Sequence, residues 1–412
     1  MSSLQPVRGT HDLLPDDSRR HRWVEEVAFA AARRYGFGEI STPIFEFTEV
    51  FSRTLGETSD VVTKEMYTFA DRSGDSLTLR PEGTAGVARA FISNGLAQSL
   101  PLKLFYRGPM FRHERPQKGR LRQFHQVGVE LLGVESPLAD VEVIALAWRV
   151  LSELGLAGKV RLELNTLGDA DSRAAYRDTL TAYLSEFRSA LGEDSRNRLD
   201  RNPLRVLDSK DEGDRKIVEG APLMGDSLTP AATEFFHTVT DGLTQLGIPF
   251  VINPKLVRGL DYYCHTAFEF TTTALGAQGT VLAGGRYDEL IAQMGGNRTP
   301  GIGWAAGVER LSMLVDQVPA PVRPITIIPM GDPLRAMAVA ERLRRAGMTV
   351  DLGYTGNMKK RMARADKVNA RFAVIMGEEE ATRGAVTIRD LDGGLQSEVP
   401  LASLEEHLGR LL

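Results

Sequence analysis

The sequence predicts a mixed α/β protein in two parts, a large N-terminal domain and a smaller C-terminal α/β module. Helical apolar patterns alternate with short strand patterns along the N-terminal part. The stretch 318–324 holds three prolines in seven residues, which is typical of a stiff linker. After this linker the pattern becomes a regular alternation of strands and helices over ~90 residues, which predicts a separate module.

The N-terminal elements follow from hydrophobic spacing and turn residues. Residues 19–35 show apolar residues at helical spacing, with Gly36 at the expected C-terminal cap. A strand pattern at 40–47 is interrupted by Pro43. A second helix is predicted at 138–154, and residues 169–245 are also helical, of which we interpret 169–230 as an insertion. The remaining strand patterns are 102–107, 124–132, 160–164, 262–270 and 279–283.

The C-terminal module shows five alternating patterns. They predict strands at 325–330, 349–352 and 372–376, and helices at 333–346 and 358–369.

Composition excludes several classes of protein. The 412 residues include one cysteine, Cys264, so no intramolecular disulfide can form. The N-terminus is polar and does not resemble a signal peptide, and no apolar run approaches the ~18 residues of a membrane span. We therefore expect a cytoplasmic protein without membrane contact. The formal net charge is −4, so any contact with nucleic acid must come from local basic patches.

One predicted strand carries polar groups on a single face. Alternation over 124–132 places Phe124, Gln126 and Glu130 on one side and valines on the other. Taken alone, this pattern also fits an ordinary solvent-facing strand. The preceding segment favours a binding site, because it is rich in arginine and contains Arg112-x-Glu114 and Arg120-x-x-x-Phe124.

These residue types suit a bent nucleotide. Arginine side chains bind phosphate oxygens in bidentate fashion, a glutamate accepts from an exocyclic amine, and an aromatic ring stacks on a base. The sequence has no G-x-x-x-x-G-K-[ST] loop, and Gly301 to Gly307 do not have the dinucleotide-binding spacing. Binding of ATP would therefore use a different type of site.

Three segments resemble the motifs of class II aminoacyl-tRNA synthetases. Residues 37–46 around Thr42-Pro43 resemble motif 1, Phe111 to Phe124 resemble motif 2, and Gly301 to Leu311 resemble motif 3. Within that class, four further segments are similar to histidyl-tRNA synthetases: Arg258-Gly-Leu-Asp-Tyr-Tyr263, Gly284-Gly-Arg-Tyr-Asp288, Leu79-Arg-Pro-Glu-Gly-Thr84 and Arg8-Gly-Thr-His-Asp12.

The resemblance implies a fold. The catalytic domain, placed at 1–320, would hold an antiparallel sheet flanked by helices, with the helical insertion at about 169–230. Residues 322–412 would form an α/β anticodon-binding domain. Motif 1 implies a homodimer.

The resemblance also implies residue roles. The α-amino group of histidine would be held by Glu82, Thr84 and Gln126, and the imidazole by Glu130 with Tyr262, Tyr263 and Tyr287. ATP would be bound by Arg112, Glu114, Arg120, Phe124 and Arg310. Arg112 and Arg258 would stabilise the charge that develops on the α-phosphate. Mg²⁺ would accompany ATP, with protein ligands that the sequence does not identify.

For tRNA(His), the resemblance implies acceptor-end contacts from Arg115 and Gln117. The C-terminal module is also locally basic, since residues 335–371 hold ten Lys/Arg and three acidic residues. A solvated helix face would explain the same charges. The seven histidines show no zinc-site spacing, so we predict no protein-bound metal centre.

Two other functions remain open at this point. A regulatory subunit of ATP phosphoribosyltransferase shares the catalytic domain and does not charge tRNA. An adenylate-forming enzyme could modify a different acceptor. The nucleotide-binding arginines and the C-terminal module count against both alternatives.

Overall fold

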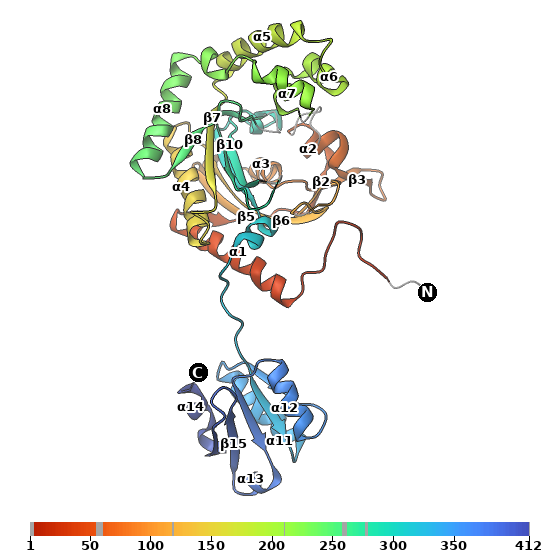
Figure 1. Cartoon of the computed structure of the whole chain (residues 1–412), viewed down its shortest axis with the longest axis vertical. Coiled ribbons are helices and arrows are strands. Elements are labelled where there is room, and N and C mark those ends of the chain that lie inside the picture. Colours follow the sequence, from red (N-terminus) through yellow and green to blue (C-terminus); the bar gives the residue numbers. More distant parts are fainter. Residues whose placement is uncertain are drawn as a thin grey trace. The chain divides into compact units, whose positions relative to one another are not determined.

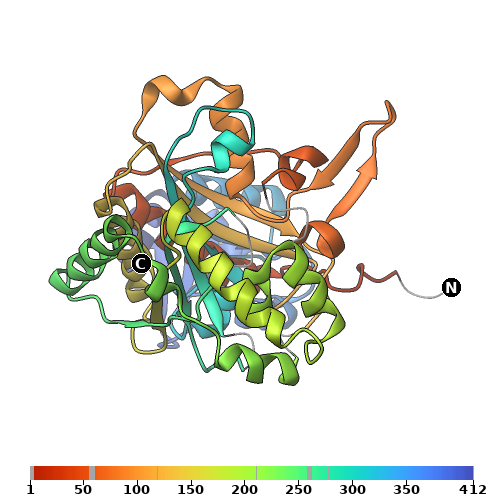
Figure 2. The same cartoon turned by 90° about the horizontal axis from the view of Figure 1, so that it is seen from above.

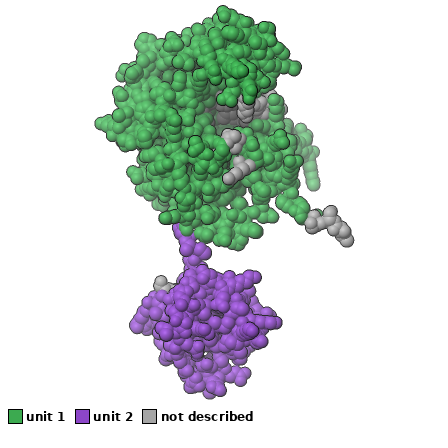
Figure 3. Space-filling view, in the orientation of Figure 1, with its two compact units in different colours: residues 1–318 green, residues 319–412 purple. Residues whose placement is uncertain are grey.

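The structure is a computed structural model that describes residues 4–54, 61–117, 119–209, 211–257, 262–276 and 279–411. The chain divides into two compact units, residues 1–318 and 319–412 (Figure 3). The boundary between the units falls within the proline-rich stretch 318–324, next to the domain limits of 320 and 322 expected above. Each unit is described by itself.

The first unit is built on an eight-stranded sheet with the order β1-β5-β6-β11-β10-β9-β7-β8. The pairs β1–β5 and β7–β8 are parallel and the other pairs are antiparallel. The strands are β1 (Gly38–Glu39), β5 (Leu102–Phe111), β6 (Gln123–Leu132), β7 (Arg161–Thr166), β8 (Phe250–Ile252), β9 (Cys264–Thr271), β10 (Thr280–Arg286) and β11 (Gly301–Gly307). The expected antiparallel sheet flanked by helices is confirmed.

Helices cover one face of this sheet. They are α1 (Pro15–Arg34), α4 (Leu138–Glu153), α8 (Pro230–Gln245) and α10 (Val308–Leu314) (Figures 1 and 2). Val127, Val129 and Leu131 of β6 belong to the same apolar core as these helices. The other face of β6 is therefore left for polar side chains, as the alternation predicts.

The first helix illustrates how local sequence sets its limits. Pro15 occupies the first turn together with Asp16 and Asp17, and basic residues fill the last turn. Gly36, with φ of 83°, follows the C-terminus in the left-handed conformation that ends many helices. The helix begins four residues before the predicted start, because proline is favoured at the first helical position.

A three-stranded sheet, in the order β2-β4-β3, lies beside the main sheet. Its strands are β2 (Phe45–Phe47), β3 (Tyr67–Ala70) and β4 (Ser76–Leu79). The interruption expected at Pro43 within the strand pattern 40–47 is confirmed, because proline cannot donate to a ladder. Within this range only Phe45–Phe47 form a strand, and β1, before Pro43, belongs to a different sheet from β2. Short helices α2 (Thr48–Ser52), α3 (Thr84–Ser93) and α9 (Leu290–Gln293), with the helical turns Val61–Glu65 and Leu96–Ser99, complete this region.

The regular elements described in the insertion are all helices or helical turns, and the insertion has its own apolar core. It contains α5 (Ala170–Glu186), α6 (Glu193–Arg201) and α7 (Glu212–Glu219), with the short turns Pro203–Asp208 and Met224–Ser227. Figure 1 shows α5, α6 and α7 grouped beyond the ends of β7 and β10.

The second unit contains a five-stranded sheet with the order β13-β12-β14-β15-β16. Its elements are β12 (Ile325–Pro329), α11 (Pro333–Arg345), β13 (Val350–Leu352), α12 (Met358–Lys367), β14 (Phe372–Met376), α13 (Glu378–Thr382), β15 (Ala385–Asp390), β16 (Gln396–Pro400), a turn at Leu401–Ser403 and α14 (Leu404–Gly409). The first five patterns predicted for this module are confirmed. No described helix in either unit is long and apolar enough to cross a membrane.

Candidate active site

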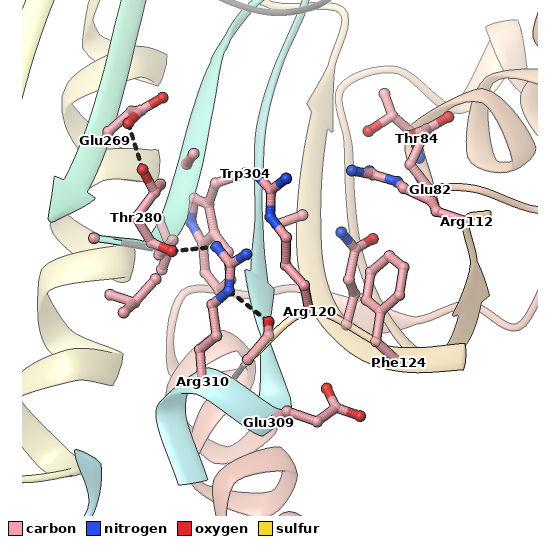
Figure 4. Close-up of a pocket in the computed structure, with 18 of the residues that line it drawn as sticks. Glu82, Thr84, Arg112, Arg120, Phe124, Glu269, Thr280, Trp304, Glu309 and Arg310 are labelled. Atoms are coloured by element: carbon pink, nitrogen blue, oxygen red, sulfur yellow. Dashed lines mark hydrogen bonds between the residues drawn. The ribbon is translucent and has the colours of Figure 1, made fainter. Parts of the chain in front are cut away.

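A pocket of about 740 Å³ opens on the polar side of the main sheet. Side chains from β6, β9, β10 and β11 line it, together with the loop between β5 and β6 (Figure 4). The structure brings most of the predicted site residues into this pocket: Glu82, Thr84, Arg112, Glu114, Arg120, Phe124, Gln126, Tyr262, Tyr263, Tyr287 and Arg310. Residues far apart in the sequence therefore meet in one cavity.

Three of the predicted residues that the structure describes do not line the pocket. Glu130 is buried behind the pocket wall and 1% exposed. Arg115 and Gln117 are exposed on the loop between β5 and β6 and do not line the pocket. Arg258 falls outside the described residues.

Carboxylates and hydroxyls gather at one end of the pocket. Glu82 accepts hydrogen bonds from the backbone N–H groups of Thr84 (2.5 Å) and Ala85 (2.9 Å), at the start of α3. The Thr84 hydroxyl donates to Oε1 of Glu130 at 2.7 Å, and the Tyr287 hydroxyl donates to Oε2. Burial raises the pKa of Glu82, and it raises the pKa of Glu130 to about 8 against the pull of the Tyr287 hydroxyl.

An unsatisfied acceptor lies near these groups. The Oε1 atom of Gln126 is buried and has no hydrogen-bond partner among the described residues. Such an atom normally costs free energy, so its position suggests a ligand that donates a hydrogen bond. Gln126 and Glu130 lie on the same face of β6, four residues apart, as the sequence predicts.

Glycines allow the close packing beneath this end. A Cβ atom at Gly303 would lie 1.9 Å from Oε2 of Glu130, and one at Gly301 would lie 2.3 Å from the Tyr287 ring. Any larger residue would displace the carboxylate or the ring. The glycines of the segment 301–307 are therefore packing requirements of the site, and the segment does not form a phosphate-binding loop.

Three of the predicted arginines line the pocket: Arg310 and Arg120 lie toward the other end, and Arg112 lies on the side of Glu82 (Figure 4). Nε of Arg310 donates to the carbonyl of Gly119 at 3.0 Å, and its Nη1 donates to the carbonyl of Thr280 at 2.6 Å. Burial lowers the pKa of Arg310, and the charges of Arg120 and Arg112 lower it further. The three guanidinium groups thus repel one another, and an anionic ligand would relieve that repulsion.

The aromatic and acidic residues of this end are already in contact with arginines. Arg112 lies over the Phe124 ring, with its Cζ atom 5.3 Å from the centroid. Nη1 of Arg120 lies 2.9 Å from Oε2 of Glu114. Nε of Arg112 donates to the Pro81 carbonyl at 2.9 Å, which holds the guanidinium beside Glu82.

Comparisons with known proteins identify the family. The family model described as Histidyl-tRNA synthetase matches residues 9–311, and the Anticodon binding domain model matches 325–411. The chain belongs to the histidyl-tRNA synthetase family. A relative from Rhodospirillum rubrum named Histidine--tRNA ligase is 67% identical, with 100% of both chains covered. A Gluconobacter oxydans relative of the same name is 58% identical over 98% of both.

Solved structures agree with the family assignment. The apo histidyl-tRNA synthetase of S. aureus has a TM-score of 0.84 and 33% identity, covering 98% of this chain and 99% of that one. A Bacillus halodurans protein described as an ATP phosphoribosyltransferase regulatory subunit/histidyl-tRNA synthetase has a TM-score of 0.66 and 22% identity, covering 88% of this chain and 97% of that one, which shows the fold alone.

The structure also contains a buried arginine whose role the sequence interpretation missed. Arg286 is fully buried on β10, directly before Tyr287. It donates to Asp140 at the start of α4, to Asp288 at 3.1 Å and to the carbonyl of Val134 at 3.0 Å. Strand alternation could have suggested it, since Arg286 must face away from Tyr287. These contacts fix the backbone that carries Tyr287.

A second cluster was also missed. Nδ1 of His125 lies 2.8 Å from Oε1 of Glu309, and the His125 backbone N–H donates to both Glu309 oxygens at 2.9 Å. His21 is close enough to join them as a potential metal ligand. The carboxylate of Glu309 is already occupied by the backbone N–H and the ring of His125. We therefore interpret the cluster as a structural contact that joins β6 to α10.

The buried Glu130 predicts a pH-dependent stability. Its pKa rises from 4.5 in an unfolded chain to about 8 in the folded protein. The folded state therefore holds the proton more tightly, and this stabilisation is lost as pH rises from 4.5 through 8, by up to about 1.4 kcal/mol per pH unit. We expect the free energy of unfolding of wild type, relative to Glu130→Gln, to decrease between pH 5.5 and pH 8 in urea titrations. A difference that is constant with pH would contradict this expectation.

Proposed function

We propose that the chain activates L-histidine with ATP and transfers it to tRNA(His), the activity that its relatives' names describe. One observation carries the proposal: a single pocket joins an acidic end with an unsatisfied buried acceptor to an end with Arg120 and Arg310, and Arg112 lies on the acidic side of these two. A zwitterionic amino acid fits the first end and a triphosphate fits the second. Their junction is where a carboxylate can meet an α-phosphate.

The acidic end suits histidine. The ammonium group would donate to Glu82, to Gln126 Oε1 and to the Thr84 hydroxyl. The imidazole would lie between Tyr262, Tyr263 and Tyr287. Glu130 would contact the imidazole through the Tyr287 hydroxyl. After a small movement of the Tyr287 ring, Glu130 could instead accept a hydrogen bond from the imidazole directly.

The arginine end suits ATP. Arg112 would contact the α-phosphate, and Arg120 and Arg310 the distal phosphates. Phe124 would stack on adenine, and Glu114 would accept from the adenine amine after exchanging its contact with Arg120.

Magnesium fits the same end through Glu269. This carboxylate lines the pocket, and its Oε2 accepts from the Thr280 hydroxyl at 2.8 Å, close to the Arg310 contact with the Thr280 carbonyl. Oxygen ligands are those that Mg²⁺ prefers. When bound, the ion would neutralise charge on the β- and γ-phosphates.

The reaction needs no covalent enzyme intermediate. The histidine carboxylate attacks the α-phosphorus, the bond to the bridging oxygen breaks, and pyrophosphate leaves with the electron pair. Negative charge builds on the α-phosphoryl oxygens, where Arg112, with Arg258, would stabilise it. Histidine-dependent exchange of pyrophosphate into ATP tests the first step, and charging of tRNA tests the second. No exchange with histidine would overturn the proposal.

The second unit would bind the anticodon. Several of its basic residues are occupied in ion pairs, since Arg342 pairs with Glu405 and Arg364 with Asp351. Lys359 and Lys360 on α12 have no ion pair among the described residues and would contact phosphates.

Truncation after Pro321 tests this role. The two units have separate apolar cores, so the fragment 1–321 is expected to fold and to keep pyrophosphate exchange. Its charging of tRNA should be poor, and it should depend less on salt than charging by the full chain, because fewer phosphates are neutralised. Equal charging by both proteins would show that residues 322–412 are not needed for tRNA.

Gln117 tests the acceptor-end assignment. It is exposed on the loop between β5 and β6, and its backbone pairs with Arg120 in an isolated bridge. An amide can donate to and accept from a base edge. We expect Gln117→Ala to reduce the charging of tRNA by an amount that corresponds to one lost base-edge contact, ~1–3 kcal/mol. Pyrophosphate exchange does not involve tRNA and should stay within about twofold of wild type. Equal losses in both assays would assign Gln117 to the ATP site.

A homodimer would cover an exposed apolar region. Phe45, Phe47 and Phe69 of the three-stranded sheet are about half exposed, and Ile44 beside them is 43% exposed. Contiguous exposed apolar groups mark protein interfaces. The cytoplasmic location expected from the sequence remains a prediction.

A further inference from the structure

A buried arginine joins the two sheets of the first unit. Arg80 directly follows β4 of the three-stranded sheet and is 6% exposed. Its Nε donates to the carbonyl of Pro109 on β5 at 2.9 Å. Its Nη1 donates to the carbonyl of Thr42 at 2.9 Å and to the Thr42 hydroxyl at 3.2 Å. The strands β4 and β5 belong to different sheets, so this side chain connects the three-stranded sheet to the main sheet.

The backbone of Arg80 is fixed at the same point. Its N–H donates to the Ile44 carbonyl at 2.9 Å, and its carbonyl accepts from the N–H of Phe111 at 2.9 Å. Gly108 on β5 leaves room for the guanidinium, because a Cβ atom there would lie 2.4 Å from Nη2 of Arg80. The main chain and the side chain of this residue are thus both attached to the end of β5.

The partners of the Arg80 guanidinium are neutral. They are carbonyl and hydroxyl oxygens, and Arg80 forms no ion pair with any residue that the structure describes. Burial lowers the pKa of this arginine, as expected for a charge removed from water. A buried charge without a counter-ion costs free energy. The planar fork of donors, which can bond to two segments at once, explains why an arginine stands here.

Both ends of this connection lead directly to the active site. The carbonyl of Pro81 accepts from Nε of Arg112 at 2.9 Å, and Glu82 accepts from backbone N–H groups at the start of α3. Arg112 follows the last residue of β5, whereas Glu82 lies two residues after Arg80. In the proposed function Glu82 would bind the histidine ammonium group and Arg112 the α-phosphate. The two groups that must be aligned are therefore carried by different sheets, which Arg80 joins.

We propose that Arg80 is a positioning residue for histidyl-adenylate formation, because it fixes the separation of Glu82 and Arg112. This inference rests on the proposed function. The histidine carboxylate must approach the α-phosphorus along a defined line, and a displacement of about 1 Å at the reacting atoms can lower the rate by about 10²-fold. Each substrate would still bind to its own group if the sheets shifted. Loss of the Arg80 contacts should therefore lower kcat with little effect on either Michaelis constant.

The test measures histidine-dependent pyrophosphate exchange by Arg80→Lys and Arg80→Gln. Lysine keeps the charge but has a single nitrogen, which cannot replace the separate donors of the fork. We expect kcat to fall about tenfold or more in both variants, with the Michaelis constants for histidine and ATP within about threefold of wild type. Arg89→Gln is the matched control, because Arg89 joins α3 to β2 through an ion pair with Glu46 at 2.6 Å. Its kcat should equal that of wild type.

Three results would overturn the inference. A lower melting temperature of Arg80→Lys with unchanged kcat would limit Arg80 to a role in stability. A raised Michaelis constant for histidine at unchanged kcat would assign Arg80 to the ammonium site alone. An equal loss of kcat in Arg89→Gln would show that the effect is not specific to the connection between the sheets.

Thr42→Val supplies a test in which the arginine is retained. Valine has nearly the shape of threonine and removes only the hydroxyl acceptor, so this variant should fold even if the Arg80 variants do not. Its kcat should fall about two- to fivefold, as expected for one lost hydrogen bond, at unchanged Michaelis constants. An unchanged kcat would contradict the role of Arg80.

The wild-type protein separates this inference from the proposed function. If wild type shows no histidine-dependent exchange, the proposed function is overturned and the inference with it. If wild type exchanges normally and the Arg80 variants match it, the inference alone is overturned.

Discussion

Arg112→Ala is expected to slow histidyl-adenylate formation by about 10²–10³-fold, the usual cost of removing one preorganised transition-state contact. Its guanidinium is held by the Pro81 carbonyl and by the Phe124 ring, at the junction of the two pocket ends. The group is therefore placed before substrate binds and needs no reorganisation. Pre-steady-state measurement of pyrophosphate release would give the rate, and ATP affinity should fall much less.

Arg115→Ala is the matched control for this experiment. It removes an exposed arginine from the same loop, outside the pocket. Adenylate formation by this variant should equal wild type. If Arg112→Ala also forms adenylate within threefold of wild type, the α-phosphate assignment is wrong.

Glu130→Gln is expected to weaken histidine binding by ~2–4 kcal/mol, because a buried charge-capable acceptor is lost from the imidazole site. The carboxyl group receives the Thr84 and Tyr287 hydroxyls, so the substitution also disturbs both side chains that face the ligand. The Michaelis constant for histidine should rise steeply while that for ATP changes little. The variant should remain folded, because glutamine has nearly the same shape as glutamate and no charged form that burial would destabilise.

Glu142→Gln provides the comparison. This carboxylate lies on α4 and pairs with Lys103 at 2.6 Å, with its side chain 35% exposed. Its substitution should leave both Michaelis constants unchanged. A histidine constant within twofold of wild type for Glu130→Gln would remove Glu130 from the recognition of the ring.

Several features of the site could be derived from local sequence. The face of β6 that carries Phe124, Gln126 and Glu130 follows from alternation, and α1 follows from apolar spacing with a proline start and a glycine end. The separate second unit follows from the prolines at 318–324 and the regular alternation after them. These features depend on periodicity and backbone restriction, which act over a few residues and are visible in a single chain.

Other features depended on contacts between distant segments. Glu130 forms a buried network with Thr84 and Tyr287, across 46 and 157 residues of sequence, and its raised pKa comes from that burial. The pairing of strands places β1 and β2 in different sheets. The packing of α4 against the main sheet buries Arg286 beside Asp140.

By itself the sequence determined the two-part organisation, the family resemblance and which face of β6 carries the site. Only the tertiary structure decided which charges are buried, which are paired, and that Arg215 on α7 of the insertion lines the pocket. Burial and pairing are properties of surfaces brought together by folding, and no local pattern records which surface will meet which.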